Sequence, residues 1–466
     1  MISLKIKFTI SIFTLFSIFS ACSLNNPQPN SVIASQNNVE TNIKDSEKIL
    51  EPGFDHNFFS VIGCKSFLGS YNPPKCMNPP IITYSFNYGS SISNIIKFND
   101  KHFVLSQDGK IYEHNFEEEI QKIFFDLSEK VQFSGLETGL LSMAFSPSHN
   151  DFLVSYVDKS GYLTFELYEY KAEDFKIINS TVIFQDIAEK KENYGTHYGG
   201  KIIWSDYFGD YLISLGDFHE GNALSRLNPD PLDNRSLKGK ILLTNIHSNT
   251  KIENIYKMEE SNQSNALQNV VTFGLRNPWQ FFEVGSFLII FDTGLSQNEE
   301  LNKVNLEDGQ INLGWPVFEG TSLSEDIDKI KNYKLDLEIE KGSLSWSEFV
   351  SKSSKLPDFY YNHYPCDALN LFGAKKNCEG SSDHYKAAII GGDILINSSS
   401  EYNFDIFFAD YLSEELFSFN LTDASFNIYP IQGINQITSV NIFNHIEEKI
   451  MVTTTLGELI ILQLNS

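Results

Sequence analysis

The residues with the clearest capacity for chemistry lie in segment 196–217, which reads THYGGKIIWSDYFGDYLISLGD. Its histidine, His197, precedes two glycines and a predicted strand, and the segment ends in Gly216-Asp217. An imidazole titrates near neutral pH and can therefore accept a proton from a substrate. The adjacent glycines would let the backbone approach a flat ligand closely. A turn histidine with a purely structural role is the alternative interpretation.

This segment belongs to one of six related units, each with an apolar strand, a polar turn and a second strand ending in aromatic residues. The clearest unit covers residues 95–112, where Asn99-Asp100 and Asp108-Gly109 predict two hairpin turns. The other units cover residues 140–170, 196–245, 279–305, 388–420 and 440–462. One unit alone cannot bury both faces of its strands, whereas units stacked around an axis can. The repeat therefore predicts an all-β fold, a six-bladed β-propeller with inserted loops; a tandem of two-sheet sandwiches is the alternative.

The composition of the 466 residues fits this fold and excludes one class of partner. Phe (38 residues) and Tyr (21 residues) are abundant, which is typical of strands. The formal net charge is −25, whereas a nucleic-acid-binding protein needs a basic face to neutralise phosphates. The sequence therefore predicts no nucleic-acid partner. Residues 321–356 have helical character, and we expect them to form an insertion at the surface.

The N-terminus has the features of an export signal. Lys5 and Lys7 precede an apolar run over residues 8–19, which is too short to span a bilayer as a mature helix. The sequence FSAC at residues 19–22 resembles a bacterial lipoprotein signal, with Cys22 as the lipid-bearing residue. We expect a signal peptide over residues 1–21, a flexible tether over residues 22–52 and the propeller over residues 53–466. The expected location is the periplasm or cell envelope; secretion without lipidation is the alternative.

The four other cysteines form two local pairs. Cys64 and Cys76 are 12 positions apart, as are Cys366 and Cys378. Disulfides Cys64–Cys76 and Cys366–Cys378 are the natural interpretation in an exported protein. Zinc binding is the weaker alternative, because no C-x-x-C spacing occurs and the pairs lie far apart in the sequence.

Four stretches, in order along the chain, resemble motifs of the glucose/sorbosone dehydrogenase family. These proteins are soluble, quinone-dependent sugar dehydrogenases, also called aldose sugar dehydrogenases, and their propeller resembles that of hedgehog-interacting proteins. The matching stretches are residues 137–147 (ETGLLSMAFSP), residues 197–217 with GKIL at 239–242, residues 273–278 (FGLRNP), and EELN at 299–302 with GWP at 314–316. Residues 390–392 and 408–411 echo the last motifs of the family. The resemblance covers residues 85–465.

This resemblance implies a pyrroloquinoline quinone (PQQ) cofactor over the central opening of the propeller. It places His197 on the catalytic base, which takes the proton from the anomeric hydroxyl of a sugar while hydride passes to the quinone. It places Arg276 on the residue that stabilises negative charge on the reduced quinone, and Asn277 beside it as a neutral donor. Glu137 falls where many family members offer an amide to the cofactor. Considered without the family, Arg276-Asn277-Pro278 is better interpreted as a structural loop with Arg276 in a salt bridge.

Calcium is the usual companion ion in the family, and it prefers carboxylate and carbonyl oxygens. Asp292, Glu299 and Glu300 are the candidate ligands, since they flank the expected cofactor loop. Solvated loop acids with no metal are the alternative interpretation of these residues in so acidic a chain.

The sequence also departs from the family at defined positions. Tyr198 replaces the asparagine that follows the catalytic histidine, and Ser146 replaces the histidine of the AFHP motif. Glu137 would repel a tri-anionic quinone. The late GGxxYRG motif reads GGDILIN, so Asn397 stands where the motif ends and its arginine is missing. Lys386 is a candidate to replace that positive charge.

Two functions follow from these residues. The first is an exported PQQ-dependent aldose dehydrogenase that takes a small sugar as substrate and passes electrons to an external acceptor. The second is a non-catalytic surface propeller that binds a glycan or a protein partner. Convergence of His197 and Arg276 on one place would favour the enzyme.

Overall fold

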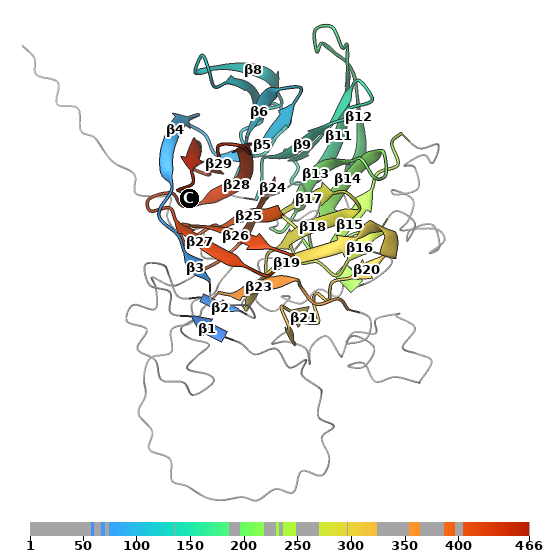
Figure 1. Cartoon of the computed structure of the whole chain (residues 1–466). Helices are drawn as coiled ribbons and strands as arrows, with labels where there is room; N and C mark the ends of the chain where they lie inside the picture. Colours follow the sequence, from blue (N-terminus) through green and yellow to red (C-terminus); the bar gives the residue numbers. More distant parts are fainter. Residues whose placement is uncertain are drawn as a thin grey trace, which may run out of the picture.

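The computed structural model describes residues 57–59, 67–69, 74–135, 137–185, 196–218, 230–232, 236–247, 270–295, 297–323, 354–363, 386–396 and 404–465. These residues form six blades arranged in a ring, as predicted (Figure 1); the blades are antiparallel except that β20 (Ile311–Asn312) and β3 (Lys75–Cys76) add parallel edge strands to two of them. The described part of the chain contains no helix with the length and hydropathy needed to cross a bilayer. The predicted signal peptide, the tether and Cys22 lie outside the described residues, and so does most of the expected insertion at 321–356.

The blades are numbered here in chain order. Blade 1 has β5 (Ile92–Phe98), β6 (Lys101–Ser106), β7 (Lys110–Asn115) and β8 (Ile120–Asp126). Blade 2 has β9 (Leu140–Phe145), β10 (Asp151–Val157), β11 (Leu163–Tyr170) and β12 (Ile177–Gln185). Blade 3 has β13 (Gly199–Ser205), β14 (Asp210–Leu215), β15 (Lys240–Leu243), β16 (Val270–Phe273) and β20 (Ile311–Asn312).

The second half of the ring includes strands from distant parts of the chain. Blade 4 has β17 (Gln280–Val284), β18 (Phe287–Asp292), β19 (Asn298–Asn305), β23 (Phe359–Asn362), β2 (Phe67–Gly69) and β1 (Asn57–Phe59). Blade 5 has β24 (Ile389–Ile396), β25 (Phe404–Asp410), β26 (Glu415–Asn420), β27 (Phe426–Pro430) and β3 (Lys75–Cys76). Blade 6 has β28 (Ile437–Asn444), β29 (Lys449–Thr454), β30 (Glu458–Gln463) and β4 (Ile81–Asn87). Outside the blades lie the hairpin β21 (Phe318–Glu319) and β22 (Ser322–Leu323) and the 3-10 turns η2 (Asp230–Leu232) and η4 (Leu306–Asp308).

The ring is closed by β4, which precedes blade 1 in the chain and pairs with the last strand of blade 6. β4 pairs antiparallel with β30, so that Asn87 lies opposite Glu458. The first strands of neighbouring blades contact one another all the way round, and β28 of blade 6 meets β5 of blade 1. A strand that precedes blade 1 thus completes blade 6 and closes the ring.

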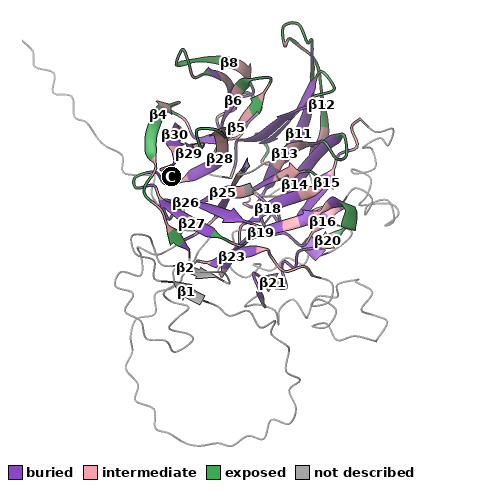
Figure 2. Ribbon diagram, in the orientation of Figure 1, coloured by how far each residue is buried: buried purple, intermediate pink, exposed green. Residues whose placement is uncertain are grey.

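Each pair of neighbouring blades encloses its own hydrophobic cluster. Blades 4 and 5, for example, bury Phe359, Phe408, Phe417 and Phe426 against one another. Equivalent clusters fill the other five interfaces. Exposure is concentrated on outer strands such as β4, β8 and β12, whereas β9, β10 and β26 are buried throughout (Figure 2). The abundance of Phe thus follows from six flat interfaces, each of which needs large apolar side chains.

Local turn chemistry agrees with the sequence. Asn99 and Asp100 both have positive φ (48° and 59°) and connect β5 to β6 as a two-residue hairpin loop. Gly109 has φ 102° and turns the chain from β6 into β7. Both predicted turns are confirmed.

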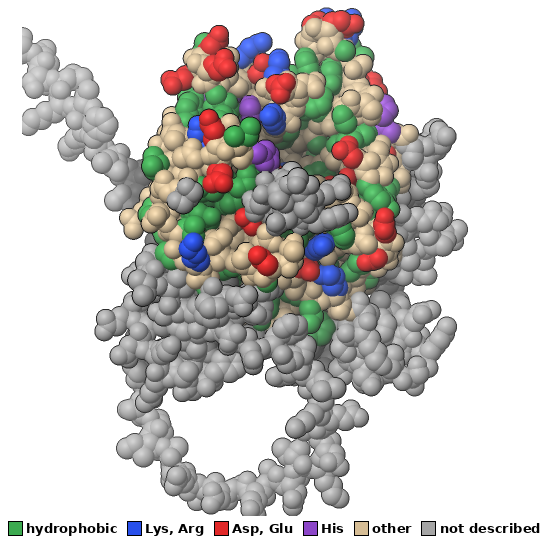
Figure 3. Space-filling model, viewed as in Figure 1, with side chains coloured by type: hydrophobic (Ala, Val, Ile, Leu, Met, Phe, Trp, Pro, Cys, Tyr) green, Lys and Arg blue, Asp and Glu red, His purple; other side chains and the backbone are tan. Residues whose placement is uncertain are grey.

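The strand directions divide the loops between two faces of the ring. We call the face on which the first strands β5, β9, β13, β17, β24 and β28 begin the His197 face, and the other the opposite face. Backbone hydrogen bonds connect loops on the His197 face, such as the one from Asp217 N–H to Arg276 C=O at 2.7 Å. On the side of the molecule shown in Figure 3, acidic and basic side chains are interspersed rather than gathered into single-sign patches.

Candidate active site

His197 is fixed by its backbone before its side chain is considered. It has φ 58°, an uncommon conformation for a residue with a side chain. Its N–H donates to the carboxylate of Glu137, and its carbonyl accepts from Phe218 N–H at 3.3 Å. Glu137, predicted to contact the cofactor, therefore holds the loop that carries His197; its predicted cofactor contact stays a prediction.

The glycines beside His197 serve contacts within the protein. A Cβ on Gly199 would lie 2.9 Å from the backbone nitrogen of Gly216, and one on Gly200 would lie 2.7 Å from a methyl carbon of Leu141. Both glycines also have positive φ. The two glycines therefore let the start of β13 pack closely against the end of β14 and against blade 2.

The imidazole of His197 lies between an acceptor and a donor. Its Nδ1 is 2.8 Å from Oδ1 of Asp217, and its Nε2 is 3.0 Å from an Nη of Arg276. A carboxylate only accepts and a guanidinium only donates, so the proton is on Nδ1 and the lone pair is on Nε2. Asp217 is held in turn by the indole N–H of Trp315 at 3.1 Å. All four side chains are buried, and together they fix the tautomer that a general base requires.

Arg276 is oriented as firmly as His197. Its second Nη donates to the carbonyls of Thr293 and Gly294, at 2.9 and 2.5 Å. Its guanidinium carbon lies 5.7 Å from the centre of the Trp315 ring. These contacts place a permanent positive charge next to the basic nitrogen of His197. The predicted convergence of the two residues is present in the structure.

Asp292, predicted as a metal ligand, supports the loop of Arg276 and Asn277. Its two oxygens accept from the backbone N–H groups of these residues at 2.8 and 2.7 Å. Burial raises the pKa of Asp292 to about 7, against the lowering effect of those two hydrogen bonds. The amide oxygen of Asn277 accepts from Gly199 N–H at 3.2 Å, which joins the loop to the start of β13.

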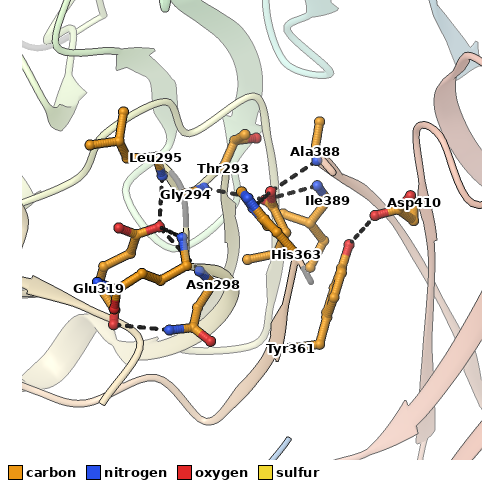
Figure 4. Close-up of polar contacts among 12 residues, drawn as sticks. Thr293, Gly294, Leu295, Asn298, Glu319, Tyr361, His363, Ala388, Ile389 and Asp410 are labelled. Carbon is orange, nitrogen blue, oxygen red and sulfur yellow. Dashed lines mark hydrogen bonds and ion pairs between the residues drawn. The ribbon is translucent and has the colours of Figure 1, made fainter. Parts of the chain in front are cut away.

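Glu299 forms a second buried histidine–carboxylate pair with His363, which is labelled in Figure 4 beside Ala388 and Ile389. Its Oε1 is 2.5 Å from Nε2 of His363, and its oxygens also accept from the N–H groups of Ala388, Ile389 and Gly294. Burial disfavours the charged forms, but the pair outweighs it: the pKa of Glu299 is lowered and that of His363 is raised. This network ties blade 4 to the first strand of blade 5.

Glu300 completes the set of predicted calcium ligands. It accepts from Gly320 N–H at 2.5 Å and from the amide of Asn302 at 3.2 Å, and burial raises its pKa well above the usual range. The three carboxylates do not form one ligand cluster. Among the described residues, the histidine and acid side chains that lie close enough together to share an ion are His149, Asp151 and His247. The structure shows these acids as acceptors for backbone N–H groups, and calcium binding stays a prediction.

Two departures from the family have a structural explanation. The phenol of Tyr198 points away from His197 and donates to the carbonyl of Gly161 at 3.2 Å, within the cluster between blades 2 and 3. The ammonium of Lys386 is fully buried, pairs with Glu415 and lies 5.3 Å from the centre of the Phe417 ring. Asn397 lies outside the described residues. Lys386 is therefore committed to a partner in its own blade.

Two residues of this centre were missed as functional from the sequence. Asp217 was visible only as the end of a strand, and Trp315 only as part of a motif. Both residues lie in stretches that match the family motifs, which was the available signal for their role. Neither the spacing of 20 positions from His197 to Asp217 nor that of 98 positions from Asp217 to Trp315 indicates contact.

Solved structures with the same fold include sugar dehydrogenases. One glucose dehydrogenase has a TM-score of 0.57 at 14% identity, and the alignment covers 83% of this chain and 100% of that one. The soluble aldose sugar dehydrogenase of Escherichia coli, in the apo-form, has a TM-score of 0.53 at 15% identity, covering 82% of this chain and 99% of that one. No protein with a curated function matches the sequence significantly. At these identities the similarity establishes the fold.

The fold and the matched sequence define an oxidoreductase that acts on a CH–OH group of a sugar. The sequence profile of the Glucose / Sorbosone dehydrogenase family matches residues 95–365, more than half of the chain. The chain belongs to the glucose/sorbosone dehydrogenase family, as the order of its motifs predicted. The match supports the enzyme over the alternative of a non-catalytic surface propeller.

Proposed function

We propose that this protein is an exported, PQQ-dependent aldose dehydrogenase, in which His197 is the general base at the anomeric hydroxyl. The observation that carries the proposal is the 3.0 Å contact between His197 Nε2 and Arg276, which joins the only lone pair of the imidazole to a fixed cation. A base and a cation side by side suit a reaction that removes a proton and places negative charge on a nearby oxygen.

The donor set fits a quinone at its oxygen atoms. Arg276 offers guanidinium N–H groups, and Asn277 offers the amino end of an amide whose oxygen already accepts from Gly199. When bound, PQQ would supply a two-electron acceptor for the hydride of the anomeric carbon. Glu137 opposes an anionic ligand, but its carboxylate is engaged with the backbone N–H of His197.

The chain's own residues account for the proton. A sugar hydroxyl must take the place of Arg276 at His197 Nε2, because that lone pair holds one donor at a time. His197 then accepts the hydroxyl proton, and the resulting imidazolium is stabilised through Nδ1 by Asp217, 2.8 Å away. Asp217 is itself oriented by Trp315. The guanidinium released from Nε2 remains bound to the carbonyls of Thr293 and Gly294, so it stays beside the reaction centre.

The remaining parts of the proposal come from the sequence. Residues 1–21 resemble an export signal with lipidation at Cys22, which implies the periplasm or cell envelope and an external electron acceptor. Disulfides Cys64–Cys76 and Cys366–Cys378 would suit that compartment. Of the four cysteines, Cys76 lies on β3 and the other three lie outside the described residues. Calcium remains an expectation from the family resemblance alone, because Asp292, Glu299 and Glu300 do not form one ligand cluster among the described residues.

Reconstitution tests the proposal directly. The purified protein is incubated with PQQ and Ca²⁺, and dye reduction is followed with a panel of aldoses. We expect a change in quinone absorbance on binding and sugar-dependent dye reduction. A folded protein that neither perturbs the quinone spectrum nor reduces the dye with any aldose would rule the proposal out.

A further inference from the structure

A second cluster of chemically capable side chains lies on the opposite face, between blades 2 and 3. His149 is in the turn from β9 to β10, Asp151 begins β10, and His247 follows β15. One ligand atom from each residue lies within 4.8 Å of the others. The strands β9 and β13 begin on the His197 face, so this cluster lies at the other end of the blades. The proposed dehydrogenase reaction does not use it.

His247 has an unused buried nitrogen. Its Nε2 is shielded from solvent and has no hydrogen-bond partner among the described residues. The nearest acid oxygen, Oδ2 of Asp151, lies 3.5 Å away, without the geometry of a hydrogen bond. A buried nitrogen without a partner is costly, because it has lost its hydration and gained nothing in return. A bound cation would provide the missing interaction for Nε2 of His247 and could be shared with Oδ2 of Asp151.

Asp151 and His247 are held in place by hydrogen bonds to other residues. The second oxygen of Asp151 accepts from the phenol of Tyr211 at 2.7 Å. The backbone N–H of His247 donates to Asp210 at 3.0 Å. Supporting hydrogen bonds of this kind orient metal ligands in proteins and raise their affinity.

His149 is supported in a different way. Its Nδ1 lies 3.0 and 3.1 Å from the hydroxyl oxygens of Ser146 and Ser148. A histidine that uses Nδ1 in this way presents Nε2 as the metal-binding nitrogen. Ser146, which replaces the histidine of the family's AFHP motif, therefore holds His149 in its present place beside Asp151 and His247, and the ring must release this contact when it turns toward a metal ion.

We propose that His149, Asp151 and His247 bind a divalent transition metal ion of the Zn²⁺ class. Two imidazole nitrogens and one carboxylate oxygen form a common donor set for Zn²⁺, whereas Ca²⁺ and Mg²⁺ prefer oxygen ligands throughout. Three protein ligands leave one tetrahedral position for water, which the exposed side of the cluster can supply. The ion would connect the β9–β10 turn of blade 2 to the segment after β15 in blade 3.

Metal binding requires one side chain to turn. The rings of His149 and His247 are stacked, with centroids 3.7 Å apart and planes 7° from parallel. A metal ion lies in the plane of each imidazole that binds it, so two parallel stacked rings cannot share one ion. His149 is exposed on a turn, and it is the ring that rotates; His247 and Asp151 are packed and stay in place.

Metal titration of the full-length protein without a polyhistidine tag tests the site. The protein is treated with EDTA, dialysed, and titrated with Zn²⁺ by calorimetry and with Co²⁺ by visible absorption. We expect one ion per chain, tetrahedral Co²⁺ bands, and a higher midpoint of thermal unfolding with Zn²⁺. Asp151→Asn and His247→Gln should each weaken binding by at least about tenfold. Ca²⁺ should produce none of these changes at the same concentration.

Two further variants keep the result interpretable. His149→Gln removes a ligand from an exposed turn and should weaken binding without affecting the fold. His445→Gln removes another exposed histidine, in the turn after β28, and should bind Zn²⁺ like the wild type. Zn²⁺ binding that is absent from the wild type, or equal in the Asp151→Asn, His149→Gln and His445→Gln variants, would overturn the proposal. The calorimetry, the Co²⁺ absorption and the thermal unfolding do not depend on quinone or on dehydrogenase activity.

Discussion

The described residues on the His197 face include two buried histidine–carboxylate pairs, His197 with Asp217 and His363 with Glu299. The pairs differ in the group that contacts them next. Nε2 of His197 lies 3.0 Å from the guanidinium of Arg276. The carboxylate of Glu299 is instead surrounded by backbone N–H groups, among them Ala388 at 2.9 Å (Figure 4).

That difference separates a base from a structural ion pair. Because a guanidinium only donates, the lone pair of His197 lies on Nε2, facing Arg276, and the ring proton lies on Nδ1, facing Asp217. Glu299 and His363 each favour the charged form of the other, so the pKa of Glu299 is lowered and the pKa of His363 is raised. A histidine next to an acid is therefore insufficient evidence for a catalytic base, and the group on its other side decides its role.

The largest effect on stability is expected at the structural pair. Glu299→Gln leaves His363 without its anionic partner and removes an acceptor from the N–H groups of Ala388 and Ile389. Breaking a buried ion pair costs about 3–5 kcal/mol. Urea unfolding of the variant measures this loss. Glu129→Gln, which removes a fully exposed carboxylate paired with Lys159 at 3.4 Å, is the control and should cost under about 1 kcal/mol. Equal losses in both variants would contradict the structural role of Glu299.

The next effect concerns activity rather than stability. Arg276→Lys keeps the charge but cannot contact His197 Nε2 and the carbonyls of Thr293 and Gly294 together. With the reconstituted enzyme we expect kcat to fall by about 10²–10³-fold, the usual cost of losing an electrostatic donor in an active site. The unfolding free energy should change much less than in Glu299→Gln. Unchanged kcat would show that the guanidinium is not part of the reaction centre.

The two pairs should also differ in their dependence on pH. The folded-state pKa of His363 is raised above 6.5, so its contribution to stability is complete below pH 6.5 and is lost as the pH rises through the folded-state pKa. Glu299 has a lowered pKa, and its contribution is lost as the pH falls below 4.5.

Urea unfolding of the wild type and His363→Gln, compared across pH, measures this window. The difference in unfolding free energy should be greatest between the two limits and should shrink as the solution becomes alkaline. A difference that grows on the alkaline side would mean that His363 is neutral in the folded protein.

The smallest expected effect is at Tyr198, beside the base. Its hydroxyl donates to Gly161 at 3.2 Å and not toward His197. Tyr198→Phe should therefore cost about 1 kcal/mol of stability, the net value of one hydrogen bond, with kcat unchanged. A large fall in kcat with normal stability would show that the phenol reaches the substrate.

The sequence predicted the fold well where the signals are local. Asn99-Asp100 specifies a turn through its own backbone preferences, and each predicted unit matches one blade. The closing strand β4 was not predicted, because its pairing of residues 81–87 with residues 458–463 connects opposite ends of the chain. The exposed Ile81 and Ile82 also give that strand no inward-facing pattern.

The site was predicted in its residues but not in their connections. His197, Arg276 and Asn277 were found through the order of motifs; the side chains of His197 and Arg276 are in contact, Asn277 contacts the backbone of Gly199, and their catalytic and cofactor-binding roles stay predictions. The role of Asp217 and the engagement of Lys386 with Glu415 depend on how strands from different positions pack, which no spacing along the chain reveals. The same holds for Asp292, whose carboxylate could not be seen to bind two backbone N–H groups.

The central claim is that His197 removes the sugar proton, and single-turnover reduction of the bound quinone by an aldose tests it most directly. The PQQ-loaded wild type, His197→Gln and His363→Gln are mixed with sugar anaerobically in a stopped-flow spectrometer. We predict that His197→Gln binds PQQ with nearly unchanged affinity but reduces it about 10²–10⁴-fold more slowly, the usual contribution of a general base. His363→Gln should reduce it close to the wild-type rate. Reduction by His197→Gln at the wild-type rate would contradict the account.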